Sequence, residues 1–498
     1  MWKLFSGIIA GSVLRYQIHA ETVAGLEKPE LPVPMTDNPE IPQLDFVIIG
    51  GGTAGSRLAY QLDSLFNVTL VDEKNFHELS VDLVPVVARP WSKDHEKECR
   101  RSMALHRYYL KRANVVTGTV NAITSDHVVL KDGRSIPYDF VAVTTGEKKP
   151  FPFGTNQRTM PARIEELHEV NQILATKKNI AIVGGGPVGV SLAAELAEAR
   201  PDARIHLFHS HSTLLPNFPM QVRQYAQKSI SEKENVKLHL EARVTDVIPV
   251  GISPPSVWSQ FVKRVTRASD DYDQIPSSYT IQFDNIERKV VPPRSVFYQW
   301  YFGLSTLQNQ VTTESITHKS TLEGIDYVFS LCGNTPHEPI GGIMSPHVTA
   351  DGHYRTSLLN QTFGHANVFV IGRAASFPFP RALYFSELQA RRVFRNVHGT
   401  MFQQGISWTA TDGLQLQRLI IPRVALRLGA NDAVGTSATW GAVLSGVGAQ
   451  KDFEADRQAL MGDFLNPTFY KPLRSAPALE RIQKWLLTAK TDVNAFNY

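Results

Sequence analysis

The sequence predicts an α/β fold in which one strand–turn–helix–strand unit occurs twice. A short apolar strand enters a glycine-rich turn at residues 45–55, and the same order of elements recurs at residues 179–189. In both units, apolar residues at helical spacing follow the turn, and a second apolar strand comes next. Prolines concentrate in residues 27–44 and about 250–320, which indicates a linker before the first unit and an insertion within the second.

The composition is that of a globular protein with more than one domain. The chain has 498 residues, 43% of them hydrophobic and 20% charged, so it can bury a sizeable core. This length suggests about two to four units of roughly 100–200 residues each. The net charge of +4 is small for the length, and we expect no nucleic-acid partner.

The cysteine content restricts the chemistry. Cys99 and Cys332 are the only cysteines, and they form no closely spaced pair. This argues against a disulfide framework, a zinc site and a dithiol redox centre, and we expect no metal. In any redox reaction, electrons would therefore have to pass through a bound cofactor rather than through a cysteine pair. So few cysteines suit a reducing compartment such as the cytosol or the mitochondrial matrix.

The two ends of the chain each leave two interpretations open. Residues 1–20 carry Lys3 and Arg15 but no acid. This fits either a targeting or surface segment (a mitochondrial presequence or a short membrane-surface helix) or a featureless arm. Residues 479–487 place apolar side chains at helical spacing among basic ones. That stripe fits packing onto the protein's own core, or a peripheral membrane contact. Mitochondrial localisation is expected, with a cytoplasmic or membrane-associated location as the alternative.

The first glycine-rich turn predicts a dinucleotide site. Gly50, Gly52 and Gly55 fit the pattern GxGxxG between a strand and a helix. The first glycine permits the tight turn, the second lets the backbone approach a pyrophosphate, and the third lets the helix pack on the strand. Asp72 follows about 20 residues later, where a carboxylate can accept hydrogen bonds from ribose hydroxyls.

The second turn has the same local context but ends differently. Gly184, Gly186 and Gly189 repeat the pattern, and the next strand ends at His209 rather than at an acid. The missing carboxylate removes repulsion against a 2′-phosphate, which predicts that NADPH is accepted. His206 and His211 lie nearby and could also tolerate that phosphate. A metal site is not expected from them, because alternate residues of a strand point to opposite faces.

Three later segments strengthen the interpretation. Residues 138–146 and 326–336 each form an apolar strand that ends in a Thr-Gly or Cys-Gly step, and residues 367–372 form a last strand that ends in Gly372. Two nested nucleotide units in this order resemble the two-dinucleotide-binding-domain flavoproteins. The resemblance implies two Rossmann-like dinucleotide-binding domains, an FAD domain with an inserted NAD(P)H domain, plus a C-terminal portion.

Within that superfamily the chain resembles the ferroptosis suppressor and apoptosis-inducing-factor-like proteins, which are related to type II NADH dehydrogenases. The likeness is carried by residues 71–77, 150–153, 207–210 and 428–435, and it covers about residues 45–460 apart from the insertion. It implies noncovalent FAD, hydride transfer from NAD(P)H and a quinone-like acceptor. The flavin would carry out the redox chemistry, and the protein would orient the reactants and exclude water.

The expected organisation and sites follow from the turns and the resemblance. We expect a targeting or linker segment (1–44), an FAD-domain first part (45–150), an NAD(P)H domain with the Pro-rich insertion (151–336), an FAD-domain second part (337–400) and a C-terminal portion (401–498). No catalytic residue is assigned. The candidate cofactor-binding residues are Gly50, Gly52, Thr53, Ala54, Gly55, Asp72, Val120, Thr145, Gly146, Gly372 and Arg373 on the FAD side, and Gly184, Gly186, Gly189, His209 and Gly333 on the NAD(P)H side.

Two positions depart from what the resemblance implies. The family's last motif carries an Asp that contacts the flavin ribityl chain, where this chain has Arg373. Arginine cannot accept a hydrogen bond, so it would pair with the FAD pyrophosphate or occupy part of the flavin site. Relatives usually carry Glu where this chain has Ser191, and a proton relay or nicotinamide contact would be lost. Glu195, one turn on, is expected at the end of a packed face or on the surface.

These departures keep a second function open. The first hypothesis is an FAD-dependent NAD(P)H oxidoreductase. The alternative is a catalytically degenerate paralogue that acts as a structural or scaffold subunit of a larger, mitochondrial assembly, with protein partners bound through the insertion at about 250–320.

Overall fold

The computed structural model describes residues 44–63, 65–92, 97, 99–250, 278–290, 312–357, 359–376, 386, 389–394, 397, 425–436 and 443–446. Its first unit is a six-stranded sheet in the order β21-β22-β9-β1-β2-β5, and only β21 runs antiparallel to its neighbour. The strands are β1 (Asp45–Ile49), β2 (Asn67–Asp72), β5 (Asn114–Thr117), β9 (Phe140–Val143), β21 (Gln361–Thr362) and β22 (His365–Val370).

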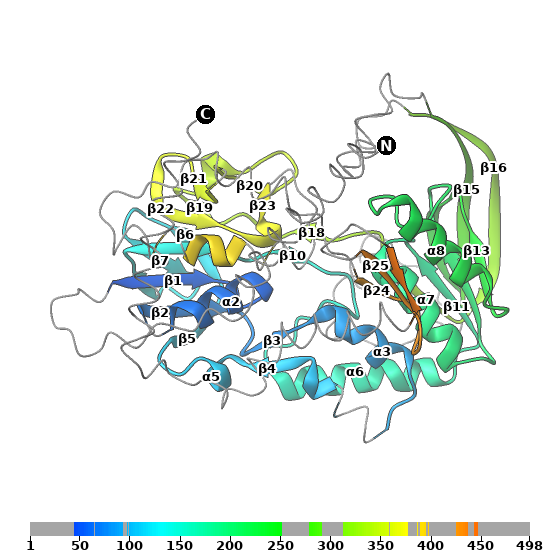
Figure 1. Cartoon of the computed structure of the whole chain (residues 1–498), viewed down its shortest axis with the longest axis horizontal. Helices are drawn as coiled ribbons and strands as arrows, with labels where there is room; N and C mark the ends of the chain where they lie inside the picture. Colours follow the sequence, from blue (N-terminus) through cyan, green and yellow to red (C-terminus); the bar gives the residue numbers. More distant parts are fainter. Residues whose placement is uncertain are drawn as a thin grey trace, which may run out of the picture.

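The second unit is a four-stranded parallel sheet in the order β13-β12-β11-β17. Its strands are β11 (Asn179–Val183), β12 (Arg204–Phe208), β13 (Val236–His239) and β17 (Tyr327–Ser330), with helices α6 (Met160–Ala175), α7 (Pro187–Ala199) and α8 (Met220–Ser231). Figure 1 shows the two units side by side, with α6 and α3 (Leu83–Ala88) running beneath them. In each unit, a parallel sheet places the ends of neighbouring strands at one edge, which is where dinucleotides bind in such sheets.

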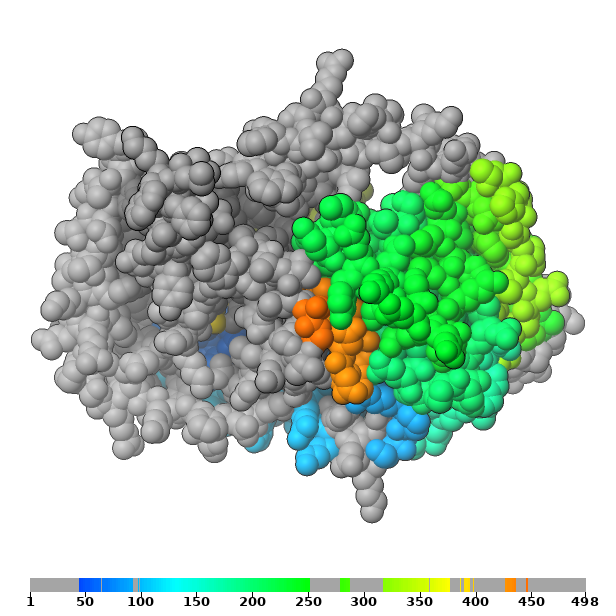
Figure 2. All heavy atoms as spheres, turned by 45° about the vertical axis from the view of Figure 1, so that its right-hand side comes forward, coloured from blue at the N-terminus to red at the C-terminus, as the bar shows by residue number. Residues whose placement is uncertain are grey.

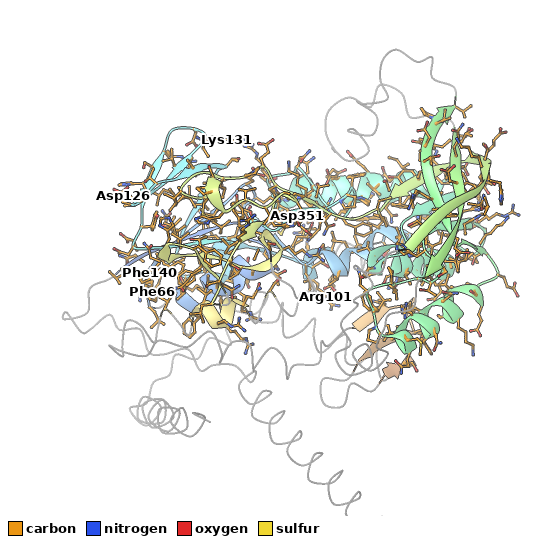
Figure 3. The ribbon with its side chains drawn as sticks, turned by 90° about the horizontal axis from the view of Figure 1, so that it is seen from above. Phe66, Arg101, Asp126, Lys131, Phe140 and Asp351 are labelled. Atoms are coloured by element: carbon orange, nitrogen blue, oxygen red, sulfur yellow. The ribbon has the colours of Figure 1, made fainter. Side chains whose placement is uncertain are left out.

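Alternating side chains of the first sheet fill two separate cores. Phe46 and Ile48 face one core together with Leu58 of helix α2 (Thr53–Leu62), whereas Val47 and Ile49 face the other. Phe66 packs edge-on against Phe140 at 6.3 Å at one end of this sheet (Figure 3). This period-2 pattern is the one expected of strands covered on both faces.

Part of the expected insertion is built into the second unit. Strands β14 (Ala242–Val250), β15 (Ser278–Val290) and β16 (Thr312–Ile325) form an antiparallel sheet, so much of the region after residue 277 is long, regular strand. The sequence interpretation missed these strands because their polar and β-branched residues stand between proline-containing stretches. The prolines at 254–255, 276 and 292–293 lie outside the described residues.

Smaller sheets join distant parts of the chain. A four-stranded sheet contains β6 (Val120–Ile123), β7 (His127–Leu130), β8 (Ser135–Pro137) and β19 (Gly341–Gly342). Three further sheets have two strands each. They pair β3 (Phe76–Glu78) with β4 (Met103–Leu105), β10 (Glu147–Lys148) with β18 (Thr335–Pro336), and β20 (Tyr354–Arg355) with β23 (Ala375–Ser376). The remaining short helices are η1 (Ser80–Asp82), α5 (His106–Tyr109), η3 (Ser345–His347) and η4 (Gly372–Ala374).

The described C-terminal residues pack on the second unit. Strands β24 (Ala425–Arg427), β25 (Ala433–Thr436) and β26 (Val443–Ser445) form an antiparallel sheet. Leu426, Leu428 and Val434 belong to the same core as residues of α3 and α7. Figure 2 shows β24 and β25 in orange against the green surface of the second unit. One hydrophobic core therefore joins the C-terminal sheet, helices α3 and α6 and the second unit.

Candidate functional site

The first glycine-rich turn has the geometry of a phosphate cradle. Gly50 has φ of +102°, a conformation that L side chains rarely adopt, and a side chain at Gly55 would collide with the Gly50 carbonyl oxygen. Gly52 caps helix α2 without any side-chain hydrogen bond, and a Cβ built on it meets no atom within 4 Å. The helix N-terminus is thus open, and its free N–H groups and dipole suit a phosphate.

Later segments predicted for the same site converge on this turn. Thr144 Oγ1 donates to the Gly50 carbonyl at 2.6 Å, and a Cβ on Gly50 would lie 3.0 Å from Thr145 Cα. A Cβ on Gly372 would lie 3.2 Å from the Cβ of Ala54. The structure therefore brings together the turn, the segment that leads into Gly146, and the end of the last strand.

Asp72 is fixed beneath the turn. Its Oδ2 accepts the Gly51 N–H at 2.6 Å and lies 3.3 Å from His106 Nε2, and its Oδ1 accepts the Lys74 N–H at 3.1 Å. Burial alone would raise the pKa of the Asp72 carboxyl, but His106 and Lys74 together lower it below the ordinary value. The carboxylate is therefore ionised and oriented, and a carboxylate has acceptor sites left for a ribose hydroxyl.

A buried polar network supports this turn, and the sequence interpretation missed it. His106 Nδ1 lies 2.7 Å from Tyr109 Oη, which donates to Ser56 Oγ at 2.8 Å. Ser56 donates in turn to the Gly51 carbonyl at 2.7 Å, and His77 Nδ1 lies 3.2 Å from the same oxygen. Burial lowers the pKa of His77 to about 3. No spacing rule could reveal this network, because α5 and α2 are joined only through the fold.

The second turn repeats the geometry of the first. Gly184 has φ of +127°, and a side chain at Gly189 would collide with the Gly184 carbonyl oxygen. Gly186 caps α7 without a side-chain hydrogen bond, and a Cβ there meets no atom within 4 Å. His209 Nδ1 accepts the Gly185 N–H at 3.2 Å. His209 therefore takes the structural position that Asp72 has in the first unit.

The strand that enters Gly333 closes the second turn. A Cβ on Gly184 would lie 3.4 Å from the Cys332 backbone nitrogen, and Cys332 directly precedes Gly333, which has φ of +122°. This repeats the way in which Thr144 closes the first turn. The predicted residues Gly184, Gly186 and Gly333 thus gather around one helix N-terminus.

The neighbouring histidines divide into two groups. His206 is buried in β12, where its Nδ1 lies 3.1 Å from His239 Nε2, and burial lowers the pKa of both rings to about 4. His206 points to the face opposite His209, so the expectation that it tolerates a 2′-phosphate is wrong. His211 is exposed, and its ring stacks on His209 at 4.9 Å between centroids.

Arg373 is engaged by another part of the protein. Its Nη1 donates to Glu147 Oε2 at 2.7 Å, and Glu147 also accepts from Asn334 Nδ2 at 3.2 Å and lies 3.0 Å from His353 Nε2. Burial alone would raise the pKa of Glu147, but Arg373 and the other two partners lower it to about 2. The sequence interpretation missed Glu147. The sequence feature that could have revealed this pairing is that an acid, Glu147, directly follows Gly146, while the last motif carries Arg373 where the family has an acid.

Ser191 and Glu195 both face the C-terminal sheet. Ser191 Oγ donates to the Arg427 carbonyl oxygen at 2.6 Å. Glu195 is 1% exposed and forms ion pairs with Arg89 at 3.1 Å and with Arg427 at 2.7 Å. Burial raises the pKa of Glu195 by more than these arginines lower it. The surface interpretation of Glu195 is therefore wrong, because residues four apart on a helix share a face and this face is covered.

The remaining predictions have different outcomes. Val120 lies in β6 and packs on the core that contains Val71, and no described contact joins it to the turn. In the part of the chain that the structure describes, no cluster of His, Cys, Asp and Glu is placed to hold a metal, and no helix is long and apolar enough to cross a membrane. Residues 1–20 and 479–487 lie outside the described residues.

Comparison with known proteins shows which proteins the chain is similar to. Residues 44–275 match the family described as "Pyridine nucleotide-disulphide oxidoreductase". The chain is 24% identical over 397 residues to apoptosis-inducing factor homolog B of Dictyostelium discoideum, covering 78% of this chain and 88% of that protein. It is 23% identical over 399 residues to ferroptosis suppressor protein 1 of Homo sapiens, covering 79% and 88%. The predicted resemblance is confirmed.

Solved structures confirm the fold. NDH2 from Plasmodium falciparum in complex with NADH aligns with a TM-score of 0.55 at 10% identity, covering 86% of this chain and 99% of that one. The sulfide:quinone oxidoreductase of Aquifex aeolicus aligns with a TM-score of 0.54 at 13% identity, covering 85% and 92%. Residues 44–275 thus match the pyridine nucleotide-disulphide oxidoreductase family, and the chain has the two-dinucleotide-domain α/β fold that the sequence predicts.

Proposed function

We propose that this protein is an FAD-dependent oxidoreductase that passes hydride from NAD(P)H through the flavin to a quinone-like acceptor. The observation that carries the proposal is the pair of open glycine-rich turns, each at an uncapped helix N-terminus and each closed by a returning strand. One such turn is a nucleotide site, and two in one chain provide places for two different dinucleotides.

The residues of the first site fit FAD. A Cβ on Gly52 meets nothing within 4 Å, so a pyrophosphate can approach the backbone there. Asp72 is held ionised by His106 and Lys74 at the end of β2, where it can accept from ribose hydroxyls. When bound, FAD would supply the electron-transfer chemistry, while the side chains named here bind and orient it.

The residues of the second site fit a nicotinamide dinucleotide. Gly186 leaves the N-terminus of α7 open, and His209 stands where Asp72 stands in the first unit. Because Nδ1 of His209 accepts the Gly185 N–H, the imidazole supports this turn without placing a carboxylate near a 2′-phosphate. This supports NADPH as a substrate comparable to NADH.

The quinone-like acceptor is supported by the names of similar proteins, one of which is a sulfide:quinone oxidoreductase. A lipid-soluble acceptor also favours peripheral contact with a membrane, for which residues 479–487 are the candidate. Mitochondrial localisation, favoured by residues 1–20, stays a prediction.

A visible absorption spectrum of the purified full-length protein tests the proposal. We expect flavin at near one FAD per chain and bleaching of its band by NADPH or NADH under anaerobic conditions. Absence of flavin from folded protein after reconstitution with FAD would overturn it.

A structural subunit is the second candidate. Two observations favour it: Arg373 is ion-paired with Glu147, and Ser191 is bonded to Arg427 in place of an acid. Folded protein without flavin, recovered in a larger assembly, would support this candidate and contradict the first.

A further inference from the structure

The chain passes between the two units twice, and both crossings meet in one short ribbon. The first crossing leads from β9 to β11 through β10, and the second leads from β17 to β19 through β18. Strands β10 and β18 pair antiparallel, with Glu147 opposite Pro336 and Lys148 opposite Thr335. Figure 1 shows both strands between the two units. The geometry of this ribbon therefore affects how the first site faces the second.

The backbone pairing of this ribbon is weak on its own. Each strand is two residues long, and Pro336 has no N–H to donate. Even a longer two-stranded ribbon is only marginally stable in water unless other contacts support it. Side-chain contacts are therefore needed to hold the two crossings in register.

Glu147 supplies such contacts to three segments. Its Oε2 accepts from Asn334 Nδ2 of the second crossing at 3.2 Å and from Arg373 Nη1 of η4 at 2.7 Å. Its Oε1 lies 3.0 Å from His353 Nε2. The Glu147 side chain is only 4% exposed, so water competes little for these bonds. We call these four residues the Glu147 cluster, and one buried carboxylate holds it together.

His353 extends the cluster to the far side of the second crossing. Its Nε2 faces Glu147, and its Nδ1 lies 3.0 Å from Asp351 Oδ2, so the ring is held between two acids. A Cβ on Gly352 would lie 2.6 Å from Pro336 Cγ, which shows that this turn packs on β18. In Figure 3, Asp351 lies between the first sheet and the sheet of the second unit. The second crossing is therefore held from both sides.

The Glu147 cluster also reaches both glycine-rich turns. Glu147 directly follows Gly146, and Asn334 directly follows Gly333, which closes the second turn. Arg373 begins beside the first turn, because a Cβ on the glycine before it would lie 3.2 Å from a side chain of α2. A displacement within the cluster would therefore shift one turn relative to the other.

We propose that Glu147 is a positioning residue, which connects Asn334 to Arg373 and thereby sets the angle at which the two dinucleotide sites face each other. The inference rests on the proposed function, because it assumes a dinucleotide at each site. Hydride transfer requires reacting atoms about 3–3.5 Å apart, and a misplacement of about 1 Å can slow a reaction on the order of a hundredfold. Binding at each turn depends on the backbone of one unit and should change little.

Anaerobic stopped-flow measurement of flavin reduction by NADPH in the full-length protein tests this. Glu147→Gln keeps the size of the side chain but removes the charge, and water can solvate Arg373, whose side chain is 39% exposed. We expect the flavin content and the Kd for NADPH to change less than about twofold, whereas the limiting rate of reduction falls about tenfold.

Two further variants sharpen the test. Asn334→Ala removes only the bond from the second crossing and should lower the limiting rate about threefold. Lys148→Gln is the matched control, because Lys148 lies in the same ribbon with an exposed side chain, and it should behave like the wild type.

A distance between the two units gives a readout that needs no flavin. Asp126, in the turn between β6 and β7 (Figure 3), and Lys228 of α8 have side chains that are 70% and 74% exposed, so both can be replaced by spin-labelled cysteines. Cys332→Ser removes the exposed native thiol. Pulsed electron paramagnetic resonance should show a broader distance distribution in Glu147→Gln, and an unchanged one in Lys148→Gln.

The outcomes separate this inference from the proposed function. A wild-type limiting rate, or an unchanged distance distribution, in folded Glu147→Gln would overturn the positioning role while leaving the function intact. The same fall in Lys148→Gln, or a loss of flavin that accounts for the slower reduction, would overturn it too. If folded wild-type protein binds no FAD, the proposed function fails. The distance distribution then decides alone: broadening in Glu147→Gln supports the positioning role, and no change rejects it.

Discussion

The two glycine-rich turns share a backbone geometry and differ in the side chain that supports each turn from the end of the second strand. In both, the first glycine has a positive φ, the third packs on the first, and the second caps a helix without a side-chain bond. In both, the N–H of the residue after the first glycine donates to the side chain at the end of the second strand. That side chain is Asp72 in the first unit and His209 in the second.

This comparison separates what shapes the turn from what selects the ligand. A carboxylate oxygen and an imidazole nitrogen both accept one backbone N–H, so either residue maintains the turn. Toward the ligand they differ, because Asp72 offers acceptors and a negative charge whereas His209 brings no carboxylate to that position. The same fold can therefore prefer different dinucleotides in its two units through one position each.

The largest effect is expected from closing either cradle. Gly52→Val should abolish FAD binding, and Gly186→Val should abolish NAD(P)H binding while FAD remains. A Cβ at either position meets no protein atom within 4 Å, so we expect both variants to fold and the loss to come from the blocked approach of a pyrophosphate. Flavin absorbance per chain and nicotinamide titration measure the two sites separately. Normal flavin content in folded Gly52→Val would show that FAD does not use the first turn.

Arg373 is the next test, because it marks where the first site departs from its relatives. Arg373→Asp places a second carboxylate beside Glu147, which has 4% of its side chain exposed. We expect a loss of about 2 kcal/mol in the free energy of unfolding and weaker FAD binding. The double variant Arg373→Asp/Glu147→Ser should regain both, measured by chemical denaturation and flavin titration.

An exposed ion pair provides the control for this change. Lys131 lies 3.4 Å from Glu338 with 55% and 78% of the side chains exposed, and Lys131 is at the outer end of β7 (Figure 3). Lys131→Asp should cost less than about 0.5 kcal/mol. A rise in FAD occupancy in the single Arg373→Asp variant would contradict the pairing argument and show that the arginine obstructs the flavin.

The strands and turns of both units could be predicted from sequence because they depend on local signals. The strand before each turn, its three glycines and the helix after it appear in the order that the motif requires. Glu147, His106 and Glu195 could not be assigned, because each finds its partner across a long stretch of sequence. Glu147 meets Arg373, and His106 meets Asp72. Such pairings depend on how sheets are joined, which no local pattern records.

The alternative functions could not be separated for the same reason. The sequence indicated that Arg373 stands where the family motif has an acid, but not that Glu147, next to Gly146, pairs with it. A single altered motif suggests loss of a site, whereas the structure shows that the arginine of this motif is paired with an acid. We infer that the two charges should be changed together in any test of the flavin site.

A smaller effect is expected at His209, where the comparison between the turns is sharpest. His209→Asp gives the second turn the acid of the first. It keeps an acceptor for the Gly185 N–H but repels a 2′-phosphate. We expect NADPH binding to weaken about tenfold, ~1.4 kcal/mol, with NADH little changed. Similar losses for NADPH and NADH, or a wild-type protein with a large preference for NADH, would contradict the assignment.

The smallest expected effect is a difference between the two units in how their stability depends on pH. The pKa values of His206 and His239 are lowered to about 4 in the folded second unit. The unfolded chain therefore binds more protons as the pH falls from 6.5 toward 4, and this stability is lost in that window. In the first unit, the pKa values of Asp72 and Glu147 are lowered, so the stability they contribute persists until the pH falls below the ordinary carboxyl range. His77, whose pKa is lowered to about 3 beside the first turn, loses its contribution in the same window as His206 and His239.

The histidine pair of the second unit should consequently loosen that unit in mild acid. Hydrogen exchange at pH 7 and pH 5, corrected for intrinsic rates, should show a loss of about 1 kcal/mol of protection in β12 and β13, and a smaller loss in β1 and β2, which lead into the turn that His77 supports. His239→Phe is the informative variant: Phe208 stacks on the His239 ring at 4.3 Å, so a phenyl ring keeps the stack while removing one titrating group. It should reduce the acid-dependent loss. Equal loosening of both units, or an unchanged response in His239→Phe, would show that these histidines do not set the acid sensitivity of the second unit.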